Sequence, residues 1–467
     1  MKEKNNVTYY PTLKIHGCLF QAEGLVGKIY NNLCVMINLE QDDIDPDMME
    51  NAINQTILRF PSTRLRRHDV KENGKKVVKQ YFVDEPETKC VRLSFKNDKK
   101  LYKFVNKLVS TKFPNDYQDC DLYKVFLVKR ENGRYSVVMC MYHLIIDSYG
   151  FAKFSEDFCN VYHAMKNNTE MPQPFKPLIP AYQTVWDYET SKRREIDIEF
   201  WKDYWNSIPA LPQYAALNGF ENKQTNIPGK RYGNFLYIFN CKAVQTNYKI
   251  PKELVERADA LAKENKFSTK MLYMLALRTW LSRNTEKTEE FLLIDLLANR
   301  SNPKVAKTGG CFADGMPFYL DAKNNMSLLE ACKYTSSCQY KFYMHSKLYE
   351  ADAKEQLEKN MNYDKKFDKG WVRGTSAFLF TYQPRFMETD GNYKISYERF
   401  TTGKSPLPIY ITVMPNDTYT GDLNVNYEYM TKVHKEEEIA EFHNFLLRFL
   451  DKATSNPELT LNELMDI

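Results

Sequence analysis

The stretch RYSVVMCMYHLIIDSYG, residues 134–150, guides the interpretation of the whole chain. Its first part, RYSVVMCMY, is apolar enough for a buried strand, and the Asn-Gly pair at 132–133 just before it is typical of a hairpin turn. The residues after HLIIDSYG recur at the spacing of one apolar helix face: Phe151, Phe154, Phe158, Val161, Tyr162 and Met165. His143 is therefore predicted to lie where a strand ends and a helix begins, a position from which side chains reach clefts.

Asp147 follows His143 by four residues, beside the expected start of the helix. One reaction that such a histidine suits is the transfer of an acyl group from a thioester. The thioester is already activated, so the enzyme needs only a base for the attacking amine or hydroxyl. A neutral imidazole, with an ordinary pKa near ~6.5, suits this proton transfer. The alternative is a hydrogen-bonded structural histidine at a strand end, because a lone His-x-x-x-Asp also occurs by chance. The aspartate is expected to fix the loop by pairing with a buried arginine.

Strand and helix patterns alternate on both sides of this stretch. Strands are predicted at 33–39, 76–83, 122–130, 289–300, 376–383, 408–415 and 423–430. Helices are predicted at 45–60, 181–194, 195–205, 251–266, 268–283, from 327 to about 362, and at 434–454. Asp45 and Ser268 are the expected N-caps of two of these helices, and Pro46 stands at a first helical position.

The chain is longer than one hydrophobic core usually supports, since it has 467 residues, of which 43% are hydrophobic. A connector with four prolines covers 166–180, and each half carries strands with flanking helices. We therefore expect an α/β (α+β) protein with two similar lobes, residues 1–180 and 181–467.

Composition excludes several classes of protein. The 65 basic and 60 acidic residues give a net charge of +5, and basic residues cluster only in TRLRRH at 63–68, so nucleic-acid binding is not expected. No apolar run approaches the ~20 residues of a membrane span, and the N-terminus lacks a signal peptide, so we expect a soluble, cytoplasmic monomer. The ten cysteines contain no CxxC pair and are expected to be reduced, with Cys18 or Cys311 as a nucleophile the remote alternative.

Other candidate sites favour plain structural interpretations. His434 and His443 flank HKEEEIAEFH, where a solvated helix face is favoured over metal ligation, and no metal site is predicted. Trp186, Trp201 and Trp205 are expected to pack between the lobes rather than to line a ligand groove. The chain contains no Gly-x-Ser-x-Gly, P-loop, Gly-x-Gly-x-x-Gly or His-Glu-x-x-His motif.

MYHLIIDSYG resembles the HHxxxDG core of nonribosomal peptide synthetase condensation domains, whose active-site logic recurs in the wider superfamily of chloramphenicol acetyltransferase (CAT). This resemblance implies that His143 is catalytic and that Asp147 is structural and pairs with an arginine from an upstream helix end. ILRFPSTRLR (57–66) resembles that helix-end motif, which makes Arg64 the predicted partner and Arg66 the alternative.

Motifs further along the chain agree with this resemblance in their order. They are EFWKDYW (199–205), IDLLANRSNPKVAKTGGCFADGMPFYL (294–320), FLFTYQP (378–384) and NPELTLNELMDI (456–467). The family fold implied is a V-shaped pseudo-dimer of two CAT-like lobes, each a mixed sheet with flanking helices, with a tunnel that passes the histidine. Asn299 and Arg300 either border that tunnel or form a turn in which the guanidinium ties loops together.

The chain also departs from the family pattern near the histidine. Tyr142 replaces the first histidine of the motif, and Ser148 replaces the glycine after the aspartate. A side chain at that position is expected to narrow the tunnel or reshape the loop, while Gly150 restores some backbone freedom. Tyr142, Ser148 and Gly150 are thus candidate tunnel residues, with Asn299 and Arg300 from the other half.

The function implied by the resemblance is an acyltransferase. It moves an acyl or aminoacyl group from a phosphopantetheine thioester, on an acyl or peptidyl carrier protein or on coenzyme A, to a small amine or alcohol. His143 assists as the base, and no bound cofactor is expected. Two alternatives remain open: a catalytically silent recruitment module, and an alcohol O-acetyltransferase that uses acetyl-coenzyme A.

Overall fold

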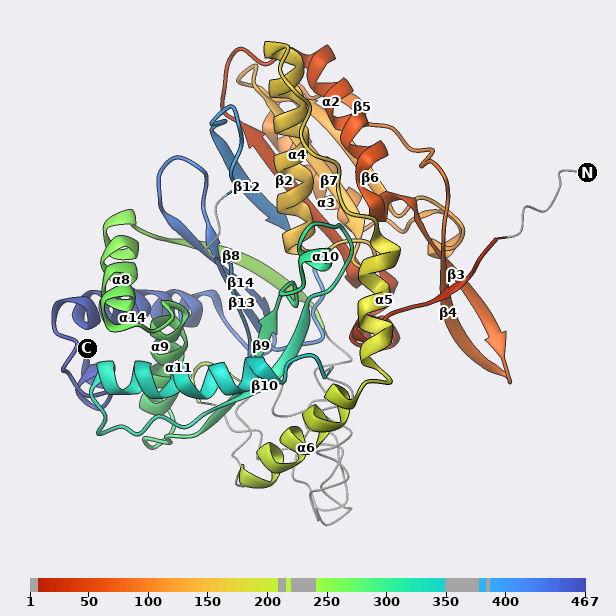
Figure 1. Cartoon of the computed structure of the whole chain (residues 1–467). Helices are drawn as coiled ribbons and strands as arrows, with labels where there is room; N and C mark the ends of the chain where they lie inside the picture. The colour runs from red at the N-terminus through yellow and green to blue at the C-terminus, as the bar shows by residue number, and fades with distance from the viewer. Residues whose placement is uncertain (1–6, 209–215, 220–240, 349–377, 384–386) are drawn as a thin grey trace, which may run out of the picture.

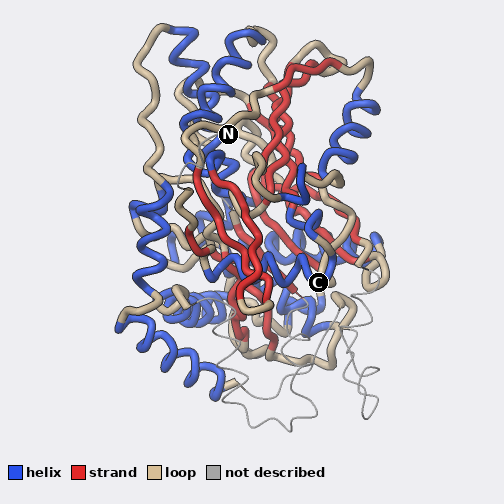
Figure 2. The backbone as a smooth tube through the Cα atoms, turned by 90° about the vertical axis from the view of Figure 1, so that its right-hand side faces the viewer, coloured by secondary structure: helices blue, strands red, loops and turns tan. Residues whose placement is uncertain are grey.

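The computed structural model describes residues 7–208, 216–219, 241–348, 378–383 and 387–467. The chain forms two lobes, each with its own sheet and its own buried apolar core (Figure 1). Both sheets contain parallel and antiparallel pairs and carry helices, so the predicted class of two mixed α/β lobes is confirmed. In the perpendicular view, strands run through the centre of the molecule and helices lie around them (Figure 2).

The first lobe is built on a five-stranded sheet with the strand order β12-β2-β7-β6-β5. These strands are β2 (Asn32–Leu39), β5 (Val91–Ser94), β6 (Tyr123–Lys129), β7 (Tyr135–Tyr142) and β12 (Ile395–Phe400). The helices are α1 (Gly17–Val26), α2 (Pro46–Arg59), α3 (Asp98–Val109), α4 (Ser148–Asn167) and α5 (Leu178–Tyr188). A separate ribbon contains β1 (Tyr10–Pro11), β3 (Leu65–Glu72) and β4 (Lys75–Phe82).

Local sequence explains how this lobe presents the central stretch. β6 and β7 form the predicted antiparallel hairpin, and Gly133 in its turn has a φ of +85°, a conformation that glycine adopts without strain. All but the first side chain of β7 are buried, so the strand is fixed on both faces. Asp45 caps α2 as predicted, because its carboxylate accepts from the backbone N–H groups of Asp47 and Met48.

The second lobe is built on a six-stranded sheet with the order β10-β9-β11-β13-β14-β8. Its strands are β8 (Ala243–Ile250), β9 (Phe291–Leu297), β10 (Asp314–Leu320), β11 (Phe378–Tyr382), β13 (Ile409–Pro415) and β14 (Leu423–Met430). Its helices are α8 (Lys252–Asn265), α9 (Lys270–Arg283), α10 (Pro303–Ala306), α11 (Leu328–Met344) and α14 (Glu436–Ser455). The predicted cap at Ser268 is wrong: Thr269 holds the N-cap position of α9 without a side-chain cap, and its hydroxyl donates to Asp259 instead.

The two halves of the sequence are not separated cleanly in space. β12 follows most strands of the second lobe, yet it pairs antiparallel with β2 and completes the first sheet, with Ile395 opposite Leu39. The predicted border at residue 180 falls inside α5, whose Tyr182 packs in the first core. A long-range pairing decides which sheet β12 joins, and the residues of β12 do not indicate this choice.

Tryptophans of the connecting helices pack within single lobes, so their predicted position between the lobes is wrong. Trp201 and Trp205, on α6 (Lys192–Ser207), are buried in the second core. Trp186 packs against the first core and stacks on Tyr10. The predicted helical stretch up to about residue 362 continues beyond α11 into residues outside the described part. None of the helices in the described ranges combines the length and apolar character needed to span a bilayer.

Candidate active site

His143 directly follows β7, five residues before α4 begins. Its backbone N–H donates to the carbonyl of Asn31 at 2.7 Å, and its ring Nδ1 lies 2.8 Å from the carbonyl oxygen of Ile146. Because a carbonyl oxygen only accepts, Nδ1 carries the proton and donates, which leaves Nε2 with its lone pair free. The loop itself therefore selects the tautomer that a base requires.

The electrostatic surroundings of His143 favour its neutral form. Burial lowers the pKa of His143 below its ordinary value of 6.5, and the charge of Asp147 offsets part of this shift. Burial lowers the pKa of an imidazole because a charged ring is poorly solvated in a protein interior. A neutral, accepting imidazole is the state in which the residue takes up a proton.

Asp147 is buried and holds loops of both lobes together. It is the N-cap of α4, where its Oδ1 accepts from the backbone N–H of Gly150 at 2.8 Å. Its two oxygens lie 2.9 Å from Nη2 of Arg300, and Oδ2 also accepts from the backbone N–H of Phe312 at 3.0 Å. The aspartate thus connects the histidine loop of the first lobe to the segment between β9 and β10 of the second.

Arg300 ties together the loop that contains α10. Its guanidinium donates to the carbonyl oxygens of Val305, Thr308 and Gly310 at 2.9, 3.0 and 2.9 Å. The Arg300 and Asp147 side chains are only 4% and 2% exposed, so this is a buried ion pair. Of the two predicted roles for Arg300, the structure supports the loop-tying turn.

The predicted pairing of Asp147 with Arg64 is wrong. The Arg64 guanidinium donates to the carbonyl oxygen of Leu58, at the end of the helix that precedes it. The alternative, Arg66, pairs instead with Asp121. Arg64 thus satisfies the end of its preceding helix and Arg66 a carboxylate of the first lobe, whereas the true partner, Arg300, lies 153 residues beyond the aspartate.

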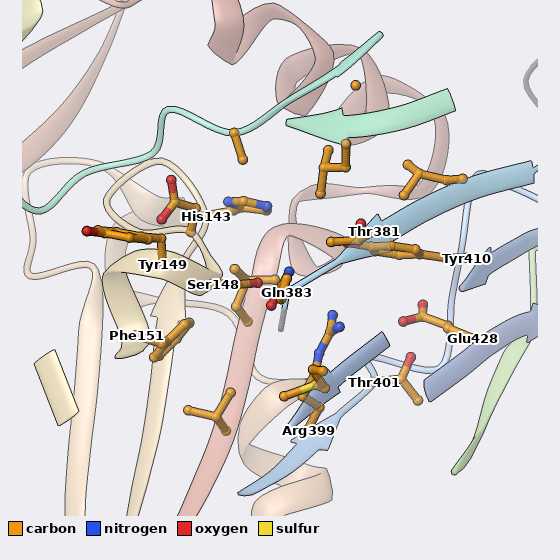
Figure 3. Close-up of a pocket in the computed structure, with 18 of the residues that line it drawn as sticks. His143, Ser148, Tyr149, Phe151, Thr381, Gln383, Arg399, Thr401, Tyr410 and Glu428 are labelled. Atoms are coloured by element: carbon orange, nitrogen blue, oxygen red, sulfur yellow. Dashed lines mark hydrogen bonds between the residues drawn. The ribbon is translucent and has the colours of Figure 1, made fainter. Parts of the chain in front are cut away.

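A cavity of about 1170 Å³ lies between the lobes and is lined by residues of both. His143 contributes from the first lobe, together with parts of α1, β2 and α4. β9, β11, β13 and β14 contribute from the second lobe, and β12 lies beside them. Figure 3 shows His143 and Ser148 on one side of this space and Arg399, Tyr410 and Glu428 on the other.

Only one of the five candidate tunnel residues lines this cavity. Ser148 does so, from the first position of α4. Tyr142 is buried away from the cavity, and its hydroxyl contacts Glu23 and Arg67. Gly150 is buried as well, while Asn299 and Arg300 are not among the described residues that line the space. The predicted tunnel roles of Tyr142, Gly150, Asn299 and Arg300 therefore find no support.

The sequence analysis missed the wall of the cavity formed by β12, β13 and β14. Arg399, Tyr410 and Glu428 point from these strands into the space (Figure 3). Burial raises the pKa of Glu428, and the charge of Arg399 offsets only part of this shift. A charged residue within a predicted strand, Glu428 in LNVNYEYM, was the available signal.

A cysteine nucleophile does not fit the geometry. Cys311 lies 3.5 Å from Nδ1 of His143, the ring nitrogen that already donates to Ile146 and so cannot accept a thiol proton. Burial raises the pKa of the Cys311 thiol well above its ordinary value, which disfavours the thiolate. Cys18, which also faces the cavity, donates its thiol proton to the carbonyl oxygen of Ile15.

His434 and His443 are buried, so the predicted solvated helix face is wrong for these two side chains. His443 lies within hydrogen-bond distance of the Tyr427 hydroxyl, at 3.0 Å. The described residues contain no cluster of three or more side chains suited to holding a metal ion.

The two mixed-sheet lobes, with a histidine at a strand end beside the cavity between them, have the chloramphenicol-acetyltransferase-like fold. Within that fold class, the chain belongs to the condensation-domain family, because the sequence profile of this family, described as "Condensation domain", matches residues 16–466. The resemblance inferred from the His143 motif is thereby confirmed.

Curated relatives are large synthetases. The chain is 22% identical over 469 residues to surfactin synthase subunit 1 of Bacillus subtilis (strain 168), which covers 98% of the chain and 12% of that protein. It is 20% identical over 425 residues to bacitracin synthase 3 of Bacillus licheniformis, which covers 89% of the chain and 6% of that protein. The chain thus spans a small part of the length of these relatives.

Several solved structures that share the fold are condensation domains. The first condensation domain of the calcium-dependent antibiotic synthetase, in complex with a substrate analogue, has a TM-score of 0.78 at 15% identity and covers 98% of this chain and 99% of its own. The starter condensation domain of rhizomide synthetase, in a mutant form with C8-CoA and Leu-SNAC, has a TM-score of 0.78 at 13% identity, with 97% and 96% covered. VibH, described as a condensation enzyme, has a TM-score of 0.71 at 14% identity, with 95% and 96% covered.

Proposed function

We propose that this protein transfers an acyl or aminoacyl group from a phosphopantetheine thioester to an amine or hydroxyl acceptor, with His143 as the base. The observation that carries the proposal is the state of the imidazole. Its Nδ1 donates to the Ile146 carbonyl at 2.8 Å, and the ring lies at the wall of the cavity between the lobes. Nε2 is then the nitrogen that accepts the proton of the incoming nucleophile.

The reaction balances without any covalent intermediate on the protein. The acceptor nitrogen or oxygen attacks the thioester carbonyl and gives its proton to His143 Nε2. The tetrahedral intermediate then collapses, the carbon–sulfur bond breaks, and the imidazolium returns the proton to the departing thiolate. Holding both substrates beside the base supplies the remaining part of the rate enhancement.

Relatives of known structure support a thioester donor. The starter condensation domain of rhizomide synthetase was solved with a coenzyme A thioester, described as C8-CoA. A carrier protein or coenzyme A presents the same pantetheine arm to a cavity of this kind. We therefore propose an acyl thioester of either origin as the donor, and a small amine or alcohol as the acceptor.

The departures of this chain from the family motif are compatible with catalysis. Tyr142, which stands in place of the first histidine, lies outside the cavity and is held by Glu23 and Arg67. Ser148 occupies the first turn of α4 with helical geometry, where no glycine is required. The retained tautomer of His143 favours an enzyme over a silent recruitment module.

The test is a His143→Ala variant assayed with acyl-pantetheine and acyl-coenzyme A thioesters and a pool of amines and alcohols. We expect an amide or ester product from the wild-type protein. The variant should lose rate by about 100-fold or more, the usual contribution of a general base. The melting temperature should stay close to that of the wild type. Turnover at the wild-type rate by the folded variant would refute the role of His143, and absence of any product would favour the silent module.

A further inference from the structure

One wall of the cavity carries charged and phenolic side chains that the proposed chemistry leaves unused. Arg399 on β12, Tyr410 on β13 and Glu428 on β14 line it (Figure 3). Tyr30 also lines the cavity. Burying charged or polar side chains costs free energy unless hydrogen bonds or opposite charges compensate. The charges of this wall therefore indicate which kind of ligand it favours.

The guanidinium of Arg399 is held in place without a carboxylate partner. Its Nη1 donates to the Thr412 hydroxyl at 3.1 Å, and its carbon lies 5.7 Å from the centre of the Tyr410 ring. The backbone of the same residue is fixed, because its carbonyl accepts from Gln245 at 2.9 Å. Across the described ranges, no Asp or Glu oxygen lies within 4.0 Å of this guanidinium, the distance limit for an ion pair.

The other positive charge at the cavity is already neutralised. Lys153 lines the same space, but its ammonium pairs with Glu156. His143 favours its neutral form because burial lowers its pKa. Among the described lining residues, Arg399 is thus the one permanent cation that has no carboxylate partner.

Glu428 lies on the same wall and opposes the charge of Arg399 only weakly. Its carboxyl group is beyond ion-pair distance, and burial raises its pKa, which favours the neutral acid. A guanidinium without a carboxylate partner at the wall of a cavity favours an anionic ligand, and its planar array of N–H donors matches a carboxylate. The field of Arg399 also contributes to the lowered pKa of His143, so the two groups interact electrostatically.

We propose that Arg399 binds a carboxylate of the acceptor, so that the acceptor is an amino acid with a free carboxyl group. This inference rests on the proposed function and names the substrate class of that site. In this arrangement the amine of the acceptor faces His143 and its carboxylate faces Arg399. A pantetheine phosphate is the other anion that could reach the guanidinium, and the test separates the two.

The test measures binding, which needs no turnover. The probes are N-hexanoyl derivatives of the standard amino acids, which resemble products, each compared with its primary amide by titration calorimetry. We expect the wild-type protein to bind at least one acid about tenfold more tightly than its amide, as a charge-assisted hydrogen bond implies. Arg399→Gln should abolish this preference, and Arg399→Lys should retain part of it because it keeps the charge.

Two matched variants sharpen the result. Lys153→Gln removes the paired cation from the same cavity and should leave the preference for the acid unchanged. Glu428→Gln removes the opposing carboxyl and should keep or increase the preference. The proposal would be overturned if the wild-type protein bound acids and amides equally, or bound neither. An Arg399→Gln variant that melts normally and still prefers the acid would overturn it as well.

A second titration compares pantetheine 4′-phosphate with pantetheine. If Arg399→Gln weakens only the phosphate compound, the anion belongs to the donor and the proposal is overturned. If His143-dependent turnover persists while the preference for acids is absent, only the acceptor assignment fails. If acids bind through Arg399 but no thioester is consumed, the proposed function fails and the carboxylate site stands.

Discussion

His143 owes its predicted reactivity to one backbone carbonyl. The Ile146 oxygen accepts from Nδ1, so the accepting nitrogen is Nε2, and burial keeps the ring neutral. Asp147, four residues away, acts on the ring through its charge and through the position of the loop. The nearby Cys311 contacts the ring but has a thiol whose pKa burial raises.

The lowered pKa of His143 has a measurable consequence. Its imidazole should titrate at a pH below 6.5 in an NMR titration of the labelled protein, with the resonance assigned by its loss in His143→Ala. The sign follows from burial, which disfavours the protonated ring. Asp147→Asn should lower this pKa further, because the carboxylate charge raises it. A titration midpoint above 6.5 in the wild-type protein would contradict the account.

Among the secondary-structure elements, the start of α4 and the loop before β10 form one unit. Ile146 makes a parallel bridge with Gly310, and the Asp147–Arg300 pair lies beside it. Since these segments belong to different lobes, the contacts hold the histidine loop against the second lobe. Loss of either charge leaves the other one buried and unpaired.

Arg300→Ala and Asp147→Ala should each lower the free energy of unfolding by about 3–5 kcal/mol, the usual effect of breaking a buried ion pair. Urea denaturation measures this change, and activity should fall with it. Arg64→Ala is the matched control, because within the described residues this arginine donates only to the Leu58 carbonyl, and it should have a much smaller effect. Similar losses in Arg64→Ala and Arg300→Ala would contradict the assignment.

Gly150 belongs to the same unit for a steric reason. A Cβ atom at this position would lie 2.7 Å from Cγ1 of Ile146, closer than two carbon atoms pack. Gly150→Ala should therefore destabilise the protein by about 1–3 kcal/mol, as overpacking does, and shift the histidine loop. Ser148→Gly at the neighbouring helix start should cost at most about 1 kcal/mol. Thermal melting of both variants tests the difference, and equal melting temperatures would argue against a steric role.

Across the complete chain, β12 and the interlobe cavity make the two lobes interdependent. β12 comes from the second half of the sequence and completes the first sheet, and it also carries Arg399. His16, near the start of the first lobe, lies within hydrogen-bond distance of the Cys311 carbonyl in the second, at 3.2 Å. This buried histidine therefore connects the two lobes.

Three buried histidines, His16, His434 and His443, predict that acid destabilises the fold. Burial lowers the pKa of His16 to about 4, of His434 to about 3 and of His443 to about 4, against 6.5 in the unfolded chain. The unfolded state thus binds more protons below pH 6.5, so stability is full above that pH and falls as the pH drops towards 4. Each histidine should cost on the order of 2 kcal/mol at pH 5.

Urea denaturation at pH 7.5, 6 and 5 measures this loss. His434→Leu removes one of the three titrating groups and should reduce the slope of unfolding free energy against pH by up to about 1.4 kcal/mol per unit. The same slope in variant and wild type would contradict the assignment to this histidine.

The sequence by itself determined the two mixed-sheet lobes, the strand–histidine–helix junction and the family, because these depend on local periodicity, turn residues and a short motif. It also predicted a structural role for Asp147. Tertiary structure alone decided which arginine neutralises Asp147, where β12 pairs, and which side chains line the cavity. These outcomes depend on contacts between residues far apart in the chain, such as Asp147 with Arg300. The sequence around one residue does not indicate which distant residue will contact it in the folded protein.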